Sequence, residues 1–153
     1  MMAVEKTPLE ALSSVETEAI LLGALMGQND KIDSIADTLS PEHFAEALHG
    51  RIYSAIVKEA SLGRPANPLT IKSYFHDDPA IGQLGGIAYL AKLTGTLSSG
   101  MSVKDCSRQI MELAERRSLV ESLETALALA RDPSQPNEIV LDATDEAITS
   151  LSS

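Results

Sequence analysis

The sequence predicts an all-α protein, built as a small globular helical bundle followed by a long helical hairpin. Ala and Leu are abundant, whereas aromatic residues make up 3% of the chain and Trp is absent. Ala and Leu favour helices, while aromatic and β-branched residues favour strands. A helical pattern of apolar residues also runs without interruption from Val103 to Arg131. These observations favour a core of helix packed on helix.

The chain of 153 residues has room for one domain, or for a compact domain with an appendage. Its apolar content of 44% and charged content of 22% are ordinary for a soluble protein. We expect a flexible leader over residues 1–12, a globular helical head over residues 13–97 and a helical hairpin over residues 102–151.

The cysteine count and the hydropathy pattern indicate the compartment. A single cysteine, Cys106, excludes an intramolecular disulfide and suits a reducing environment. Charged residues interrupt any apolar stretch near the start, so we find no secretory signal. The longest apolar run, Ala19–Met26, is far shorter than the roughly 20 residues of a membrane span. We therefore expect a cytoplasmic protein without a membrane segment.

The first helix of the head is expected to begin near Ser13. Ser13 with Glu16 three residues later fits a capping box, in which side chains satisfy the first free backbone N–H groups of a helix. Apolar residues of Val15–Met26 then recur on one face, and residues 27–30 break the helix. A second helix is expected over about residues 31–39.

Residues 40–42, Ser-Pro-Glu, give the sharpest local signal of a helix start. Ser is a favoured N-cap, Pro is tolerated at the first helical position, and Glu suits the positive end of a helix. A short helix carrying Phe44 should follow, and then a longer one over about Leu48–Leu62. Gly63 stands where a left-handed residue commonly ends a helix.

Residues 64–68 contain two prolines and should form an extended connector. We expect a short helix over Thr70–Phe75, a turn at residues 76–79 and a helix over Ile87–Leu93. The glycines between residues 82 and 86 lack the lysine and the spacing of a phosphate-binding loop, so we expect them to shape a turn.

The helical pattern of apolar residues over Val103–Arg131 is the basis for predicting a hairpin. A helix of about 29 residues is longer than most globular helices. It carries two apolar stripes on different faces, which requires two packing partners. Residues 132–136 contain two prolines that end it, and a last helix over about Asn137–Leu151 completes an αα-hairpin. Because a hairpin has one internal seam, the second stripe must pack against the globular part or another chain.

The sequence carries no pattern of catalysis. The net charge of −10 and pI near 4.6 argue against direct binding of nucleic acid, which needs Lys and Arg clusters. His43 and His49 lack the spacing of paired metal ligands, and His49 is expected to be partly buried and bonded to backbone. Cys106 is expected to serve packing. There is no P-loop motif. We predict no catalytic, metal-binding or cofactor-binding residue in this segment.

Several short patterns follow one another in a fixed order. They are Val15–Leu25, Leu39–Phe44, His49–Tyr53, Gly63–Thr70 and Gly85–Leu93. Taken together, they resemble the N-terminal domain of the DnaB-type replicative DNA helicases, over roughly residues 15–151. One departure is Cys106, where the family often has an aromatic residue. Another is that family members continue through a linker into a RecA-like ATPase domain, which is absent from this chain.

The resemblance implies an assembly role. In such helicases this domain pairs through its helical hairpin, and three pairs form a collar on a hexameric ring. The collar also contacts the primase and, in some systems, the helicase loader. ATP, Mg and most DNA contacts belong to the absent ATPase domain, so the parent protein would be an ATP-dependent DNA helicase. Carried onto this sequence, the dimer interface would consist of Ile110, Leu113, Val120, Leu123, Leu127, Val140 and Ala147.

Two other functions stay open on the residues alone. The helicase-binding domain of a primase resembles this plan of helices plus hairpin, and there a zinc-binding and polymerase region would precede the segment. A stand-alone helical adaptor that mimics the collar to bind a helicase is the other. A metal-dependent hydrolase ranks last, because no ligand set is visible.

Overall fold

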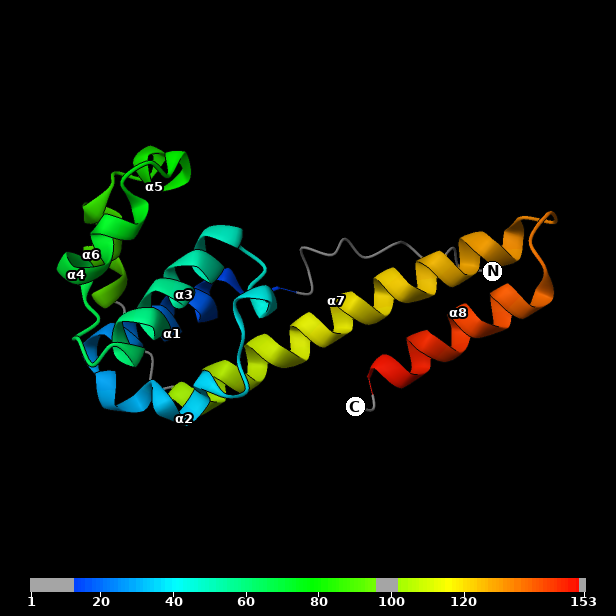
Figure 1. Ribbon diagram of the computed structural model, residues 1–153, viewed down its shortest axis with the longest axis horizontal. Coiled ribbons are helices and arrows are strands. Elements are labelled where there is room, and N and C mark those ends of the chain that lie inside the picture. The colour runs from blue at the N-terminus through cyan, green and yellow to red at the C-terminus, as the bar shows by residue number, and fades with distance from the viewer. Residues whose placement is uncertain (1–12, 96–101, 152–153) are drawn as a thin grey trace, which may run out of the picture. The chain divides into compact units, whose positions relative to one another are not determined.

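The computed structural model describes residues 13–95 and 102–151, and every regular element within these ranges is a helix. The helices form two compact units (Figure 1). We call residues 14–111 the head and residues 112–151 the hairpin. The long helix α7, Val103–Arg131, contributes its first turns to the head and the remainder to the hairpin. The all-α class and the helical hairpin predicted from the sequence are confirmed.

Helix α1, Val15–Gly27, begins one residue later than expected, because Ser14 rather than Ser13 is its N-cap. The Ser14 hydroxyl oxygen accepts a hydrogen bond from the backbone N–H of Thr17 at 3.3 Å. Leu21, Leu22 and Leu25 of α1 are completely buried. This helix is therefore the centre of the head core.

The chain between α1 and α3 is less regular than predicted. The expected helix over residues 31–39 is instead the 3-10 helix η2, Asn29–Lys31, and the four-residue helix α2, Asp33–Ala36. The Asn29 side chain holds the chain directly after α1. Its Nδ2 donates to the carbonyl oxygens of Leu25 and Ala66, at 2.8 and 3.0 Å, and its Oδ1 accepts from the backbone N–H of Ala66 at 2.9 Å. This side chain ties the end of α1 to the connector before α4.

The Ser-Pro-Glu signal at residues 40–42 starts the 3-10 helix η3, Pro41–His43. The cap is closed by histidine rather than by glutamate, since the backbone N–H of Ser40 donates to His43 Nδ1 at 2.9 Å. Helix α3, Ala47–Ser61, then crosses the core. Gly63 follows its C-cap and has a φ of 72°, which suits glycine.

The rest of the head consists of short helices. They are α4, Pro68–Ile71, the 3-10 helix η4, Lys72–Phe75, α5, Pro79–Gln83, and α6, Ile87–Thr94. Helix α5 was not predicted. It begins where Asp78 accepts a hydrogen bond from the backbone N–H of Ala80 at 3.0 Å and is paired with Arg51 at 2.8 Å. The Arg51 guanidinium lowers the pKa of the Asp78 carboxyl.

Glu59 forms a second charged tie within the head. Its carboxylate is almost fully buried and accepts two bonds from Arg64, each 2.9 Å long, and one from the Tyr74 hydroxyl at 2.6 Å. The bonds from Arg64, followed by the one from Tyr74, lower the pKa of Glu59. The carboxylate therefore links the end of α3 to η4.

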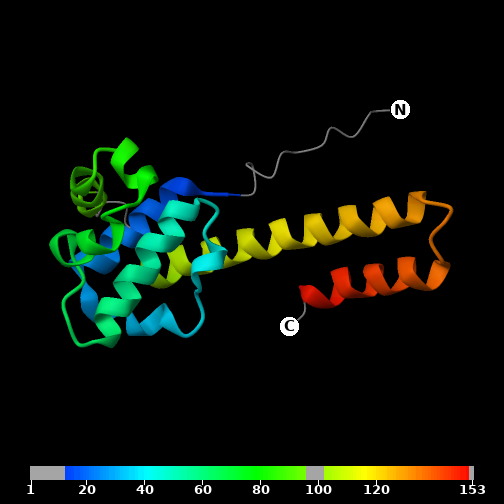
Figure 2. The same ribbon diagram turned by 45° about the horizontal axis from the view of Figure 1, so that its top comes forward.

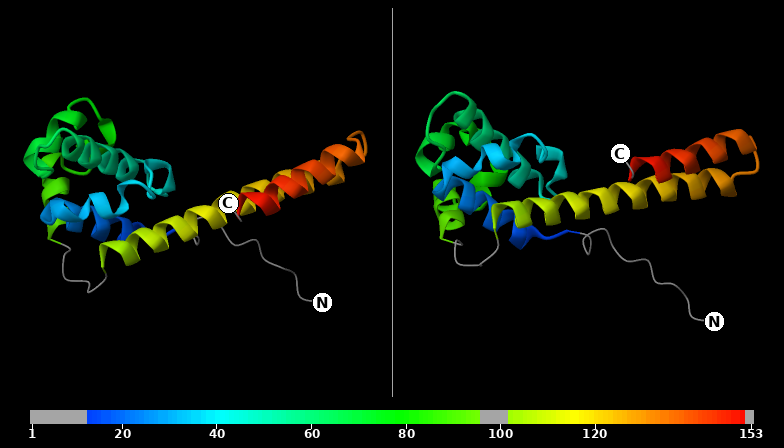
Figure 3. Two further views of the ribbon diagram at one scale, coloured as in Figure 1. Left: turned by 60° about the horizontal axis from the view of Figure 1, so that its bottom comes forward. Right: turned by 90° about the horizontal axis from the view of Figure 1, so that it is seen from below.

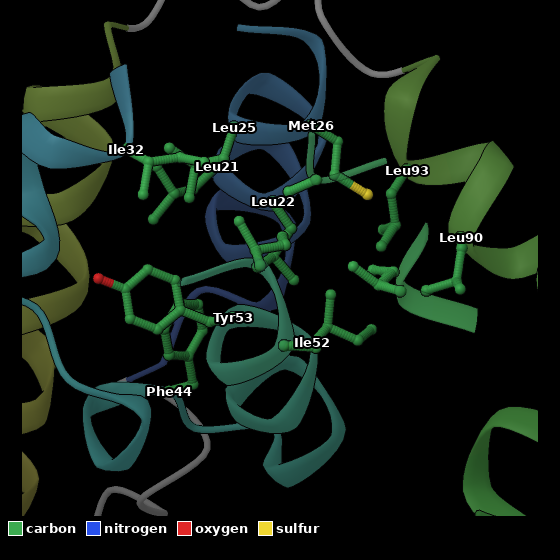
Figure 4. Packing of buried hydrophobic residues seen from close by; sticks show 14 of the residues in the cluster. Leu21, Leu22, Leu25, Met26, Ile32, Phe44, Ile52, Tyr53, Leu90 and Leu93 are labelled. Atoms are coloured by element: carbon green, nitrogen blue, oxygen red, sulfur yellow. The ribbon is translucent and has the colours of Figure 1, made fainter. Parts of the chain in front are cut away.

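The core of the head lies between α1, α3 and α6. Leu22 of α1, Ile52 of α3 and Leu90 and Leu93 of α6 point toward one another (Figure 4). The Tyr53 hydroxyl donates to the carbonyl oxygen of Leu39 at 2.8 Å, and burial raises its pKa to about 12.

The first turns of α7 complete this core, because Val103, Cys106 and Ile110 are buried in it. The compact head thus extends beyond the expected boundary at residue 97 to Met111. Among the described helices, none is long and apolar enough to cross a membrane.

Candidate functional site

The hairpin is formed by the C-terminal part of α7 and by α8, Asn137–Ser150, which runs back alongside it (Figures 2 and 3). Asp132 shapes the turn between them: its Oδ1 accepts from the backbone N–H of Ser134 at 3.0 Å and from the Ser134 hydroxyl at 2.6 Å. These bonds lower the pKa of Asp132. Pro136 then precedes the first residue of α8 and prevents the helix from continuing through the turn.

The two helices meet along a seam of mostly small side chains. Ala126 of α7 and Ala147 of α8 are 6% and 0% exposed. Half-buried side chains at helical spacing extend this seam: Leu119, Ser122, Leu129, Val140 and Ala143. The seam therefore encloses only part of the apolar surface on either helix.

That larger apolar surface is exposed. Leu123 and Leu127 of α7 are 44% and 48% exposed, and Leu141 and Ile148 of α8 are 63% and 62% exposed. Singly exposed leucines are ordinary on a protein surface, but a continuous apolar area indicates an interaction site. The question is whether the residues of the two helices lie together.

Helix geometry places them on the same side of the hairpin. At about 100° per residue, the row of Val120, Leu123 and Leu127 is rotated by roughly a third of a turn from the seam of α7. The row of Leu141, Ile148 and Leu151 is rotated by roughly a fifth of a turn, in the same sense, from the seam of α8. Because the helices are antiparallel, equal senses of rotation bring both rows to one side. We call these six residues the outer apolar face.

The rows also match in height along the hairpin. Leu127 lies four residues before the end of α7, and Leu141 lies four residues after the start of α8. Val120 and Ile148 each lie eleven residues from those same helix ends. Since both helices rise by about 1.5 Å per residue, Leu127 is level with Leu141, and Val120 with Ile148. The outer apolar face is therefore continuous across both helices.

The other side of the hairpin is polar. The same rotation places Ser118, Glu121 and Thr125 of α7 there, and all three are exposed. From α8, Glu146 and the single apolar residue Ile139 lie on this side. We call this the polar face. The contrast between the two sides marks the outer apolar face as the candidate site.

The structure divides the seven residues predicted for a dimer interface among four environments. Val120, Leu123 and Leu127 lie on the outer apolar face. Val140 and Ala147 lie in the seam, where their partners belong to the same chain.

Ile110 is 2% exposed inside the head core, and Leu113 is half-buried at the start of the hairpin. Ile110 and Ala147 therefore have their apolar partners within the chain and are not free for a second one. Sequence reasoning omitted Leu141, Ile148 and Leu151. Their spacing of seven and three residues along α8 was the signal that could have found them.

The head contains a buried chain of hydrogen-bonded polar side chains. It has the residue types of a catalytic relay but is not accessible to a substrate. Glu18 Oε1 lies 3.0 Å from His49 Nδ1, and His49 Nε2 lies 2.7 Å from the Tyr89 hydroxyl. Glu18 also accepts from the backbone N–H groups of Ala45 and Glu46, at 2.7 and 3.3 Å. Burial, followed by the charges of Glu46 and Glu18, raises the pKa of Tyr89.

Both Glu18 and His49 are 1% exposed, so a substrate could not reach them. The hydrogen bonds among Glu18, His49 and Tyr89 join α1, α3 and α6, so these side chains have a structural role. His49 was predicted to bond backbone; it contacts two side chains instead. Within residues 13–95 and 102–151, no group of three or more His, Cys, Asp or Glu side chains is arranged to hold a metal ion.

A shallow hollow of about 420 Å³ lies on the head over Pro41, Phe44 and Ala47. It exists because η3 lies close against α3. A Cβ atom on Gly50 would come within 2.7 Å of the carbonyl oxygen of Pro41. Gly50 therefore permits the close approach of the two elements, and the hollow is a consequence of how they pack.

Comparison with known proteins gives the family. Residues 10–112 match the model of the DnaB-like helicase N terminal domain, which covers the head. The replicative DNA helicase DnaB of Rickettsia conorii is 34% identical over 108 residues, which cover 71% of this chain and 22% of that protein. The one from Treponema pallidum is 29% identical over 138 residues, covering 90% of this chain and 32% of that protein.

The fold has a close counterpart as well. The crystal structure of the N-terminal domain of DnaB helicase from Mycobacterium tuberculosis matches with a TM-score of 0.77 at 23% identity, covering 90% of this chain and 96% of that one. The chain spans about a fifth to a third of the length of these full-length relatives. With a matching fold and a family match over most of its length, this chain belongs to the DnaB-like helicase N-terminal domain family.

Proposed function

We propose that this chain is the N-terminal collar domain of a replicative DNA helicase and that it assembles by pairing its hairpin with that of a second copy. The observation that carries the proposal is the outer apolar face, which crosses both helices of the hairpin and has no partner within the described residues of the hairpin. The family membership supports it, since the relatives are replicative helicases. The same matches favour this function over a primase domain or an adaptor.

A second copy is the natural occupant of the face. Apolar side chains that cover one side of a two-helix layer bury best against an equivalent layer, and a two-fold axis presents the same patch from both chains. Leu123 lies near the middle of the face, between the level of Leu127 and that of Val120. An isologous contact would bring the two copies of this residue close to the axis.

A collar role would involve further contacts and would leave catalysis to another domain. Pairs of this domain would associate as three dimers on a hexameric ring, and the collar would dock a primase or a helicase loader. ATP and Mg would bind in a motor domain outside these residues, which would also make most contacts to DNA. The acidic composition of this chain supports that division, because an acidic surface repels phosphate groups.

Sedimentation equilibrium at micromolar concentration tests the pairing. We expect a dimer or larger species for the unaltered chain, and a monomer for the double variant Leu123→Asp with Leu127→Asp, because each substitution would place a charge in an apolar contact. The matched control is Ser118→Asp with Thr125→Asp, which adds the same two charges to the polar face. Measured at 150 mM NaCl, where charge repulsion across the dimer is mostly screened, it should leave the dimer intact.

Two results would contradict the proposal. One is a strict monomer for the unaltered chain. The other is a dimer that survives the Leu123 and Leu127 substitutions but is lost with those at Ser118 and Thr125. Circular dichroism on every variant shows that the helices have formed.

A further inference from the structure

The hairpin is much more acidic than the head. Residues 112–151 contain nine carboxylate side chains and three arginines, for a net charge of −6 in a segment of forty residues. The head, residues 14–111, has eleven carboxylates and eight basic residues, for a net charge of −3. All nine carboxylates of the hairpin are exposed. The unit with the unpartnered apolar face is therefore also the unit with the highest charge density.

On α8, the charged side chains lie mostly away from the outer apolar face. Helix α8 carries four carboxylates and no basic residue. Glu138, Asp142 and Asp145 recur at intervals of four and three residues, which places them on the back of α8, opposite the seam. They would stay in water when two outer apolar faces meet, so pairing would not remove their charge.

We infer that the negative charge of the hairpin opposes its own pairing, so that dissolved salt strengthens the dimer. The inference rests on the proposed pairing and adds its regulation. Packed helix layers lie about 10 Å apart, so pairing brings two segments of charge −6 within range of each other. Charges on the far sides then repel one another across roughly 20 Å, a distance that depends on layer thickness.

Screening decides how strongly this repulsion acts. The Debye length is about 30 Å at 0.01 M salt and about 8 Å at 0.15 M. At the lower salt concentration the repulsion is felt almost in full across the dimer, whereas at the higher one it is mostly screened. An interface held by surface ion pairs would respond in the opposite direction, because salt weakens attraction between opposite charges.

The test measures the dimer Kd of the full chain by sedimentation equilibrium at 10 mM and 150 mM NaCl, at constant pH near 7.5. We expect pairing to be about tenfold tighter or more at 150 mM, given the change in Debye length. The triple variant Glu138→Gln, Asp142→Asn and Asp145→Asn removes three charges from the back of α8 without touching the outer apolar face. It should pair more tightly than the unaltered chain at 10 mM and respond less to salt.

A variant of opposite sign serves as the control. Arg131→Gln removes a positive charge near the hairpin turn and should weaken pairing at 10 mM. The inference is overturned if the dimer Kd at 150 mM NaCl is equal to or higher than that at 10 mM. It is also overturned if the triple variant keeps the full salt response. A chain that is monomeric at both salt concentrations, and also as the triple variant, would overturn the proposed pairing and the inference with it.

Discussion

The head and the hairpin are built from the same kind of helix but differ in how they satisfy their surfaces. In the head, most large apolar side chains form an enclosed core, although a few, such as Leu62, Leu69 and Leu84, are exposed. Buried polar groups such as Glu18 and Glu59 have several partners each. In the hairpin, the enclosed seam consists mainly of small side chains, and the large ones lie outside. The head therefore has a large apolar core within its own chain, whereas the hairpin leaves most of its large apolar side chains exposed.

The comparison predicts that truncating a large apolar side chain to alanine will change the free energy of unfolding very differently in the two units. Ile56 is completely buried in the head, and Ile56→Ala should lower the free energy of unfolding by about 4 kcal/mol through lost burial and the cavity left behind. Leu141→Ala on the outer apolar face should change the stability of the monomer by less than about 0.5 kcal/mol. Urea denaturation, carried out at a protein concentration below the dimer Kd, measures the free energy of unfolding of both variants. Equal losses would show that the hairpin side chain is packed within its own chain.

The buried polar chain gives the next largest effect. Glu18→Ala would leave two backbone N–H groups and the His49 ring without their acceptor in a buried site. We expect a loss of about 3 kcal/mol of stability, because unsatisfied buried polar groups keep their full desolvation cost. In the hairpin, Glu121→Ala removes an exposed carboxylate and is the control. A loss of less than about 1 kcal/mol for Glu18→Ala would show that this polar chain does not hold the head together.

Close packing in the head can be tested at Gly50. Gly50→Ala would force a Cβ atom to within 2.7 Å of the Pro41 carbonyl oxygen, so η3 must move away from α3. We expect a loss of about 2 kcal/mol from this overpacking, measured by thermal or urea unfolding. Ser122→Ala in the seam of the hairpin, where small residues already meet, should be nearly neutral. A neutral result at Gly50 would mean that η3 is free to shift.

Acid should weaken the head through the paired carboxylates of Glu59 and Asp78, and this is the smallest of the expected effects. The folded-state pKa values of Glu59 and Asp78 are lowered, so their contribution to stability is present above the unfolded pKa values, 4.5 and 3.8, and is lost as pH falls through the folded ones. Stability should therefore decline as pH drops below about 4.5, as followed by urea midpoints. Arg64→Gln, which removes the main cause of the shift at Glu59, should flatten part of that decline. If the loss of stability in acid were unchanged in this variant, the Glu59–Arg64 ion pair would not be its cause.

Much of the fold could be predicted, because local signals and burial agree in the longest elements. The bounds of α7 were predicted as Val103–Arg131 and are found there. Helix α5 was missed although Asp78-Pro79 is the same kind of start signal as Ser40-Pro41, because the glycines that follow suggested only a turn. The helix predicted over residues 31–39 was too long: α2 ends at Ala36, and the carbonyl oxygen of Leu39 accepts a hydrogen bond from the distant Tyr53 hydroxyl, a contact that local sequence does not reveal.

The candidate site was predicted less well than the fold. Periodicity identifies which positions of a helix are apolar, but not which partner each of them meets. Ile110, Val120 and Ala147 were therefore grouped together, although they lie in the head core, on the outer apolar face and in the seam. Only the antiparallel pairing of α7 with α8 shows that Leu123 and Leu127 share a face with Leu141 and Ile148.

The most direct test of the central claim compares two neighbouring positions of α8 that lie on opposite sides of the hairpin. In a Cys106→Ser background, Leu141→Cys places a thiol on the outer apolar face and Ile139→Cys places one on the polar face. Thiol labelling rates are then measured as protein concentration rises through the dimer range. We predict that labelling slows at position 141 and stays constant at position 139. Constant labelling at position 141, or slowing at position 139 instead, would contradict pairing through the outer apolar face.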